Sequence, residues 1–246
     1  MHSMIYHKKY GIAALCVIFV LGFVALMGLP ALFGKLKEYQ DTKKYSVIAV
    51  SLSEEEKTDV EKEINNLNES LKGTDVSDGV ARAALYRSLG EKYEKVGHLA
   101  KSASVYRLAL TAYPKDAEAL ASLGLLYGRM GKLAIGEESI KQALDFEPRT
   151  LMLYSKLASF YREYGHDKDA ARGVYLEGLI RTNNDSDLMR EYATFLESIG
   201  EGYEAYLYWD ALSKKDPSDV TLAARVMELQ QTYQAVIQAQ KDTANQ

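Results

Sequence analysis

The chain has 246 residues, 47% of them hydrophobic, and a net charge of −4 at neutral pH. All 34 acidic residues follow residue 34, whereas only two of the 30 basic residues precede it, so the remainder carries 28 − 34 = −6. A general nucleic-acid-binding surface needs clustered lysine and arginine, and this acidic balance argues against that function.

The first predicted element is a membrane span at residues 11–34, after a short tail at 1–10. The run has no charged residue, and at ~1.5 Å per residue its 24 residues reach about 36 Å, enough for a hydrocarbon core of ~30 Å. A signal peptide has a shorter apolar region, about 7–15 residues, and a small-residue cleavage site. An uncleaved anchor is therefore favoured over a signal peptide. The only cysteine, Cys16, lies inside this run and excludes an intrachain disulfide.

The orientation of the span has two interpretations. Lys8 and Lys9 flank its N-terminal end, and more lysines flank the other end, which places the C-terminal side in the cytoplasm. A ten-residue head before one apolar span is instead typical of a signal anchor with an exported domain. We favour a single-pass membrane protein with its large domain on the exported side.

Residues 35–52 are predicted to be a juxtamembrane linker, and residues 53–82 to contain an amphipathic helix. Ser53 with Glu56 three residues later is a capping-box signature. Four apolar residues then follow at spacings of three or four, which predicts one apolar stripe: Val60, Ile64, Leu67 and Leu71. The stripe either packs on the next element as an N-terminal cap or pairs with a second copy as a coiled-coil stem. It covers less than three heptads, so the cap is preferred.

A series of glycines at fixed spacing marks the rest of the chain. Gly97, Gly131, Gly165 and Gly200 are 34, 34 and 35 residues apart, and such a period indicates stacked repeats. The spacing predicts four units at 83–116, 117–150, 151–185 and 186–219, with one residue inserted after Gly165. A C-terminal capping helix and tail follow at 220–246. Each glycine is expected to end a helix in a left-handed conformation.

Residue classes recur at fixed places within each unit. Large residues occupy places four, seven, eleven and twenty-four, small residues occupy eight, twenty and twenty-seven, and proline occupies thirty-two. In the second unit these are Leu120, Leu123, Tyr127, Ile140, Gly124, Gly136, Ala143 and Pro148. The small residues allow two helix backbones to approach closely, and the large ones fill the space beside them. Asn183 and Leu212 depart from the pattern, and Asn183 predicts an irregular junction between the last two units.

In these residues the segment 83–217 resembles the tetratricopeptide repeat (TPR) family. The resemblance implies an all-α fold, a right-handed superhelical α-solenoid of helix-turn-helix repeats, preceded here by one transmembrane helix. It also implies a groove lined by the first helix of each pair, at places two, five, nine, twelve and thirteen. The candidate partner-binding residues are Arg87, Glu91, Leu125, Arg129, Met152, Ser159, Arg162, Arg190 and Thr194.

Each unit supplies one arginine to this set. A guanidinium on a concave surface can bind a carboxylate in bidentate fashion, or it can simply pair with neighbouring glutamates.

The sequence has no nucleophile, phosphate-loop or metal-ligand motif, and its four histidines form no ligand set. We therefore expect a non-enzyme with no cofactor and no metal. The expected function is a membrane-anchored protein-interaction module, acting as an adaptor, scaffold or assembly factor. The alternative is a permanent structural subunit of a larger envelope or secretion complex. The expected partners are a protein or peptide and, through the N-terminal helix, the membrane, without nucleic acid or a small-molecule substrate.

Overall fold

The structure is a computed structural model that describes residues 52–244. Over these residues it has ten α-helices, one π-helical turn and no strand. The predicted tail at 1–10, the span at 11–34 and nearly all of the linker at 35–52 lie outside the described residues. Among the helices that are described, none has both the length and the apolar character needed to cross a bilayer.

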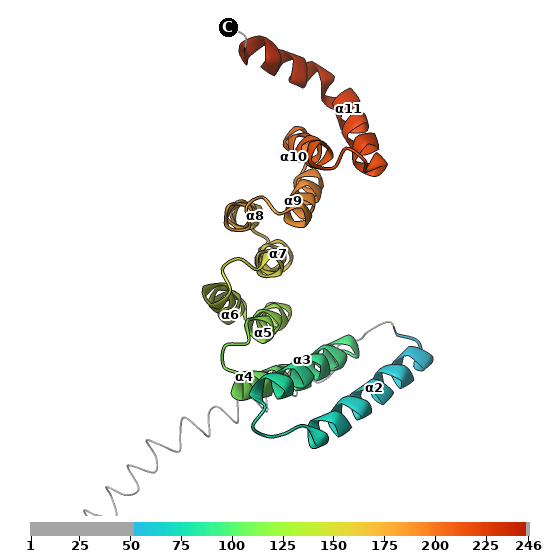
Figure 1. The fold of residues 1–246 in the computed structure, drawn as a ribbon, viewed down its shortest axis with the longest axis vertical. Coiled ribbons are helices and arrows are strands. Elements are labelled where there is room, and N and C mark those ends of the chain that lie inside the picture. The colour runs from blue at the N-terminus through green and yellow to red at the C-terminus, as the bar shows by residue number, and fades with distance from the viewer. Residues whose placement is uncertain (1–51, 245–246) are drawn as a thin grey trace, which may run out of the picture.

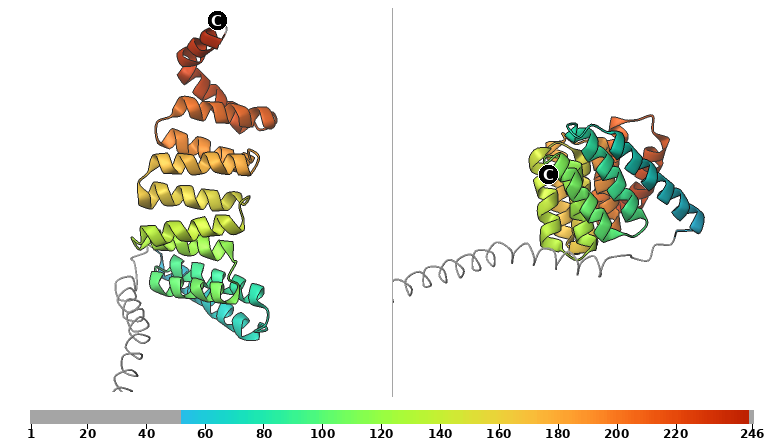
Figure 2. Two further views of the ribbon diagram at one scale, coloured as in Figure 1. Left: turned by 90° about the vertical axis from the view of Figure 1, so that its left-hand side faces the viewer. Right: turned by 90° about the horizontal axis from the view of Figure 1, so that it is seen from below.

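The helices form antiparallel pairs that stack in chain order into an elongated column (Figures 1 and 2). Helix α2 lies at one end of the column and α11 at the other (Figure 1). The helices are α2 (Glu54–Gly73), α3 (Gly79–Lys95), α4 (Leu99–Ala112), α5 (Ala117–Arg129), α6 (Leu133–Phe146), α7 (Leu151–Phe160), the π turn η1 (Tyr161–Gly165), α8 (Lys168–Arg181), α9 (Ser186–Ser198), α10 (Gly202–Lys215) and α11 (Val220–Ala244). This all-helical stack of paired helices is an α-solenoid.

The helix boundaries relate simply to the repeat period. Helices α5, α7 and α9 begin at residues 117, 151 and 186, which are the first residues of the second, third and fourth units. Helix α3 begins at Gly79, four residues before the start assigned to the first unit at 83. Asp78 explains the earlier start, because its side chain accepts a hydrogen bond from the Ala81 amide and caps the helix.

Helix α2 has the predicted capping box. The Ser53 amide donates to the Glu56 carboxylate over 2.7 Å, and the Glu56 amide donates to the Ser53 hydroxyl over 3.2 Å. On the apolar stripe, Val60 and Ile64 are buried in a cluster with Leu89 and other side chains of α3 and α4. The stripe therefore packs on the first repeat of its own chain.

The small residues bring paired helices together, as their spacing predicts. A Cβ atom on Gly124 of α5 would lie 2.6 Å from the Gly136 carbonyl oxygen of α6. In the first pair, the buried Ser102 hydroxyl donates to the Gly90 carbonyl of the facing helix over 2.8 Å. The helix backbones approach so closely at these places that a larger side chain has no room.

Three of the four series glycines end a helix as predicted, and the third does not. Gly97, Gly131 and Gly200 have φ angles of 80°, 72° and 90°. In the third unit the left-handed residue is His166, with φ 50°, while Gly165 belongs to the π turn. The expectation for Gly165 is thus wrong by one residue.

The π turn explains this shift. In the first unit the His98 amide bonds to the Tyr93 carbonyl, five residues back, over 2.8 Å. The equivalent bond in the third unit joins the Asp167 amide to the Tyr161 carbonyl, six residues back, over 3.0 Å. A π turn holds one residue more than an α turn. The inserted residue therefore lies within the turn at 161–165 rather than after it.

The junction between the last two units is irregular, as Asn183 predicts. Asn183 and Asn184 have φ angles of 57° and 56°, so both are left-handed, and Asn183 occupies the place at which the other units have a proline. The Lys215 ammonium donates to the Asn184 carbonyl over 2.6 Å and ties this turn to the end of α10.

The last helix, α11, covers the end of the stack. Leu222 and Leu229 are buried in the same cluster as Leu212 and Trp209 of α10. The helix bends at Tyr233, whose φ and ψ of −106° and 16° are not helical. Its second half extends away from the column (Figure 1).

Candidate functional site

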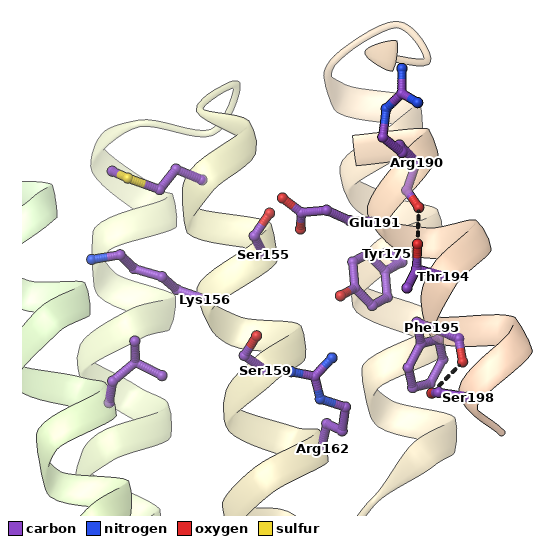
Figure 3. A pocket seen from close by; sticks show the side chains of 12 residues that line it. Ser155, Lys156, Ser159, Arg162, Tyr175, Arg190, Glu191, Thr194, Phe195 and Ser198 are labelled. Atoms are coloured by element: carbon purple, nitrogen blue, oxygen red, sulfur yellow. Dashed lines mark hydrogen bonds between the residues drawn. The ribbon is translucent and has the colours of Figure 1, made fainter. Parts of the chain in front are cut away.

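A cavity of about 520 Å³ lies on the face formed by the first helices of the third and fourth units. Six of the nine predicted partner-binding residues line it, and we call it the α7–α9 groove (Figure 3). They are Leu125 from α5, Met152 and Ser159 from α7, Arg162 from η1, and Arg190 and Thr194 from α9. The periodic spacing thus brings together residues that are up to 69 positions apart in sequence.

The other three predicted residues, Arg87, Glu91 and Arg129, do not line this groove. One Arg87 nitrogen lies 2.8 Å from both carboxylate oxygens of Asp116, and another lies 3.1 Å from Glu118. Asp116 is only 3% exposed, and it also caps α5 by accepting from the Ala119 amide over 3.0 Å. Arg87 therefore joins the first unit to the start of the second, and its charge is already matched.

Replacing Arg87 with glutamine should lower the free energy of unfolding by about 1–2 kcal/mol, since a charge-assisted hydrogen bond to a buried carboxylate is lost. The same variant should leave ligand binding at the α7–α9 groove unchanged. Thermal unfolding and a binding titration on the same preparation measure the two effects. A loss of binding without a loss of stability would contradict the structural role.

Arg129 and Glu91 line a separate, smaller cavity of about 420 Å³ together with Glu94 and Lys95. Arg129 lies 3.5 Å from Glu94. Burial nevertheless raises the pKa of Glu94 above its ordinary value, because loss of hydration outweighs the attraction of Arg129. This part of the concave face holds opposed charges that neutralise one another.

The raised pKa of Glu94 predicts a pH effect on stability. The folded chain holds the proton more tightly than the unfolded chain, so this group contributes most at or below pH 4.5, and the contribution is lost as the pH rises through the folded pKa. Glu94→Gln mimics the protonated form and removes this dependence. The wild-type chain should therefore lose stability relative to Glu94→Gln between pH 4.5 and 7. Unfolding midpoints of the two proteins measured across that range check the sign.

Three cations, Lys156, Arg162 and Arg190, and one carboxylate line the α7–α9 groove. Lys156 donates to the Ser122 hydroxyl of α5 over 2.9 Å. Burial lowers the pKa of Lys156, while nearby glutamates oppose the shift. Arg162 lies 2.9 Å from Glu163, and both side chains are nearly half exposed.

Arg190 is the least engaged of these cations. Its exposed guanidinium makes no hydrogen bond or short ion pair with any residue in the described part of the chain. Its charge acts weakly on Asp219, whose pKa is lowered mainly by a hydrogen bond from Thr221 and least by Arg190. The guanidinium donors are therefore available to a ligand.

The hydroxyl groups around the groove act mainly as hydrogen-bond acceptors. Ser155, Thr194 and Ser198 each donate their proton to a backbone carbonyl three or four residues earlier, over 3.3, 2.9 and 2.6 Å. Their oxygen lone pairs remain for a ligand. Beneath them, the Tyr175 and Phe195 rings lie 5.3 Å apart between centroids and are almost fully buried, so they form an apolar floor.

Ser155 also lines the groove and occupies place five of the third unit, which was expected to face it. Sequence reasoning missed the other five lining residues: Lys156, Tyr175, Glu191, Phe195 and Ser198. Two of them, Lys156 and Glu191, occupy place six of their units, next to a place that was expected to face the groove. Ser122, the partner of Lys156, occupies place six of the second unit. A search that included place six would have found this line of polar residues.

No known protein-family model and no curated protein sequence matches the chain. Solved structures are similar to it. One is TTC0263, a thermophilic TPR protein of Thermus thermophilus, with a TM-score of 0.51, 16% identity, and coverage of 69% of this chain and 90% of that one. PilF of Pseudomonas aeruginosa has a TM-score of 0.49, with 18% identity over 65% of this chain and 73% of its own. A structure of MamA has a TM-score of 0.48, with 18% identity over 71% and 99%.

The similarity to TTC0263 supports the TPR fold that the repeat pattern indicates.

Proposed function

We propose that the chain is a membrane-tethered protein-interaction module whose α7–α9 groove binds a segment of a partner protein. The observation that carries this proposal is the groove itself, a cavity of about 520 Å³ in which the Arg190 guanidinium has no hydrogen-bonded or ion-paired partner from the described residues. Binding alone is the mechanism. A preformed curved surface costs little ordering free energy when a partner arrives.

The apolar run at 11–34 would hold this module at a bilayer, with the repeats on the exported side. Tethering raises the effective concentration of a partner that is bound to the same membrane. This arrangement suits an adaptor, scaffold or assembly factor. A C-terminal reporter enzyme that is active only after export tests the topology. A stably expressed fusion whose reporter stays inactive would reverse the proposed orientation.

A second candidate is a permanent structural subunit of a larger complex. The observation in its favour is a set of exposed apolar side chains on the second helices of the pairs, none of which lines the α7–α9 groove. They are Leu108, Ile135, Ile180 and Leu207, with exposures of 47%, 50%, 79% and 45%. Apolar side chains on this outer surface would be covered in a stable assembly.

Site-specific photocrosslinking separates the two candidates. A photoreactive amino acid at Ser159 probes the groove, and the same amino acid at Ile180 probes the outer surface of α8. A partner-binding module should give a protein adduct from Ser159 in native membranes and none from Ile180. A permanent subunit should give its main adduct from Ile180 and remain in a stoichiometric complex after detergent extraction. If Ser159 gave no adduct, the groove would not be the partner-binding site.

A further inference from the structure

We propose that the α7–α9 groove selects an extended acidic peptide with two carboxylates about four residues apart, one bound by Arg162 and one by Arg190. This inference rests on the proposed function and specifies the chemistry of the partner segment. The two arginines lie on different helices on the same face (Figure 3).

The charge balance of the groove favours an anionic ligand. Lys156, Arg162 and Arg190 face one carboxylate, Glu191, within the lining. Carboxylates of the first two units also attract the Lys156 ammonium and oppose the lowering of its pKa by burial. Arg162 has one exposed partner, and a pair of that kind is worth only about 0–1 kcal/mol and yields easily to a better acceptor. Arg190 has no such partner among the described residues.

The repeat geometry gives the spacing of the two carboxylates. Arg162 occupies place twelve of the third unit and Arg190 occupies place five of the fourth, a difference of seven places. Seven residues at ~1.5 Å each, combined with a helix separation of about 8–10 Å, place the two backbones about 14 Å apart. An extended peptide rises ~3.3 Å per residue, so about four residues span that distance.

The centre of the groove favours an extended ligand over a helical one. Ser155, Thr194 and Ser198 present acceptor oxygens there, because their protons are donated to the backbone. The Glu191 carboxylate adds another acceptor, and its side chain extends toward Ser155 across the groove (Figure 3). An extended peptide offers free backbone N–H groups to these acceptors, whereas a helix uses its own N–H groups internally. An apolar residue between the two acids would meet the Tyr175 and Phe195 floor.

A direct binding measurement tests this proposal. The probe is a fluorescein-labelled peptide, Gly-Ser-Glu-Ala-Leu-Ser-Glu-Ser-Gly, titrated with the full-length chain in mild detergent and followed by fluorescence anisotropy. In one control peptide both glutamates are replaced by glutamine. In the other the two glutamates are kept but stand only two residues apart. The first peptide should bind at least about tenfold more tightly than either control, which corresponds to about 1.4 kcal/mol. Binding should weaken as salt is added.

Two protein variants locate the effect. Arg190→Gln removes one proposed contact and should lower the affinity for the acidic peptide about tenfold. Arg181→Gln is the matched control, because Arg181 is an exposed arginine of α8 that lies 3.7 Å from Glu177 and does not line the groove. It should leave the affinity unchanged. Both positions are exposed, and circular dichroism verifies that both variants fold.

Equal affinity for the acidic and glutamine peptides, no measurable binding of either, or an unchanged affinity in Arg190→Gln would overturn the inference. Each of these results would leave the proposed function standing if Ser159 still crosslinks a partner. If Ser159 did not crosslink a partner but the acidic peptide still bound tightly, the inference about ligand chemistry would hold. The proposed function of the groove in the cell would then be wrong.

Discussion

Replacing Gly124 with alanine should lower the free energy of unfolding by about 3 kcal/mol, although it adds one methyl group. The new Cβ atom would lie 2.5 Å from Cγ1 of Ile140 and 2.6 Å from the Gly136 carbonyl oxygen. Ile140 is 0% exposed, and the carbonyl belongs to the backbone of α6. Relief therefore requires the whole of α6 to move, which disturbs every contact between the two helices of the second unit.

Thermal unfolding measures this effect. A change of 1 kcal/mol shifts Tm by roughly 2–4 °C for a chain of this size, so Gly124→Ala should lower Tm by roughly 6–12 °C. Gly173→Ala is the control, because it makes the same chemical change within α8, where an added Cβ meets no atom within 4 Å. It should raise stability by about 0.5–1 kcal/mol, since alanine is the better helix former. Shifts of equal sign in the two variants would show that backbone contact is not what Gly124 provides.

The repeat period predicts the paired helices because the small residues that it places at fixed positions are the ones at which the two helix backbones come into contact. Gly124 and Gly136 are glycines for the same reason, and each is visible in the sequence as a small residue at its place. The capping box at Ser53 is likewise local, and its two partners are three residues apart. Such features depend on neighbours within one helix or one unit, so spacing alone finds them.

The third unit shows where spacing fails. The sequence has Gly165 in register with Gly97 and Gly131, and glycine is the usual left-handed residue. The structure assigns that conformation to His166, because the extra residue is taken up by a π turn before the end of the helix. A period counted in residues assumes α-helical turns throughout and does not reveal which turn holds an insertion.

Periodicity also does not predict which of the groove arginines pair with carboxylates of the chain and which remain available to a ligand. The partner of Arg87 is Asp116, 29 residues away, whose second role as the cap of α5 fixes it in place. Arg129 meets Glu94 from the preceding unit. Groove-facing arginines of different units thus have different surroundings, because each meets the residues of a neighbouring unit. The first two units neutralise their cations internally, and the last two leave cationic groups facing the groove.

A second substitution with a large expected effect on stability lies at the C-terminal end of the stack, where one carboxylate joins three helices. Glu197 of α9 accepts from the Trp209 indole of α10 over 2.6 Å and from Nε of Arg225 of α11 over 3.2 Å. A second Arg225 nitrogen pairs with the other Glu197 oxygen. Trp209 is 8% exposed, so its N–H group has little access to water if the carboxylate is removed. Leaving a buried donor unsatisfied costs about 1–3 kcal/mol, and the lost ion pair adds to it.

Glu197→Ala should therefore lower the free energy of unfolding by about 2–3 kcal/mol and loosen α11 first, since among the described helices α11 packs mainly against α10. The chain has a single tryptophan, so the intrinsic fluorescence at 295 nm excitation reports this site alone. The emission maximum should move to longer wavelength well below the main unfolding transition. Glu228→Ala is the control, because it removes the more exposed partner of Arg225 and should cost at most about 1 kcal/mol. If Glu197→Ala changed the emission and Tm no more than Glu228→Ala does, the indole and guanidinium contacts would contribute nothing to holding α11. Its docking would then rest on apolar contacts such as those of Leu222 and Leu229.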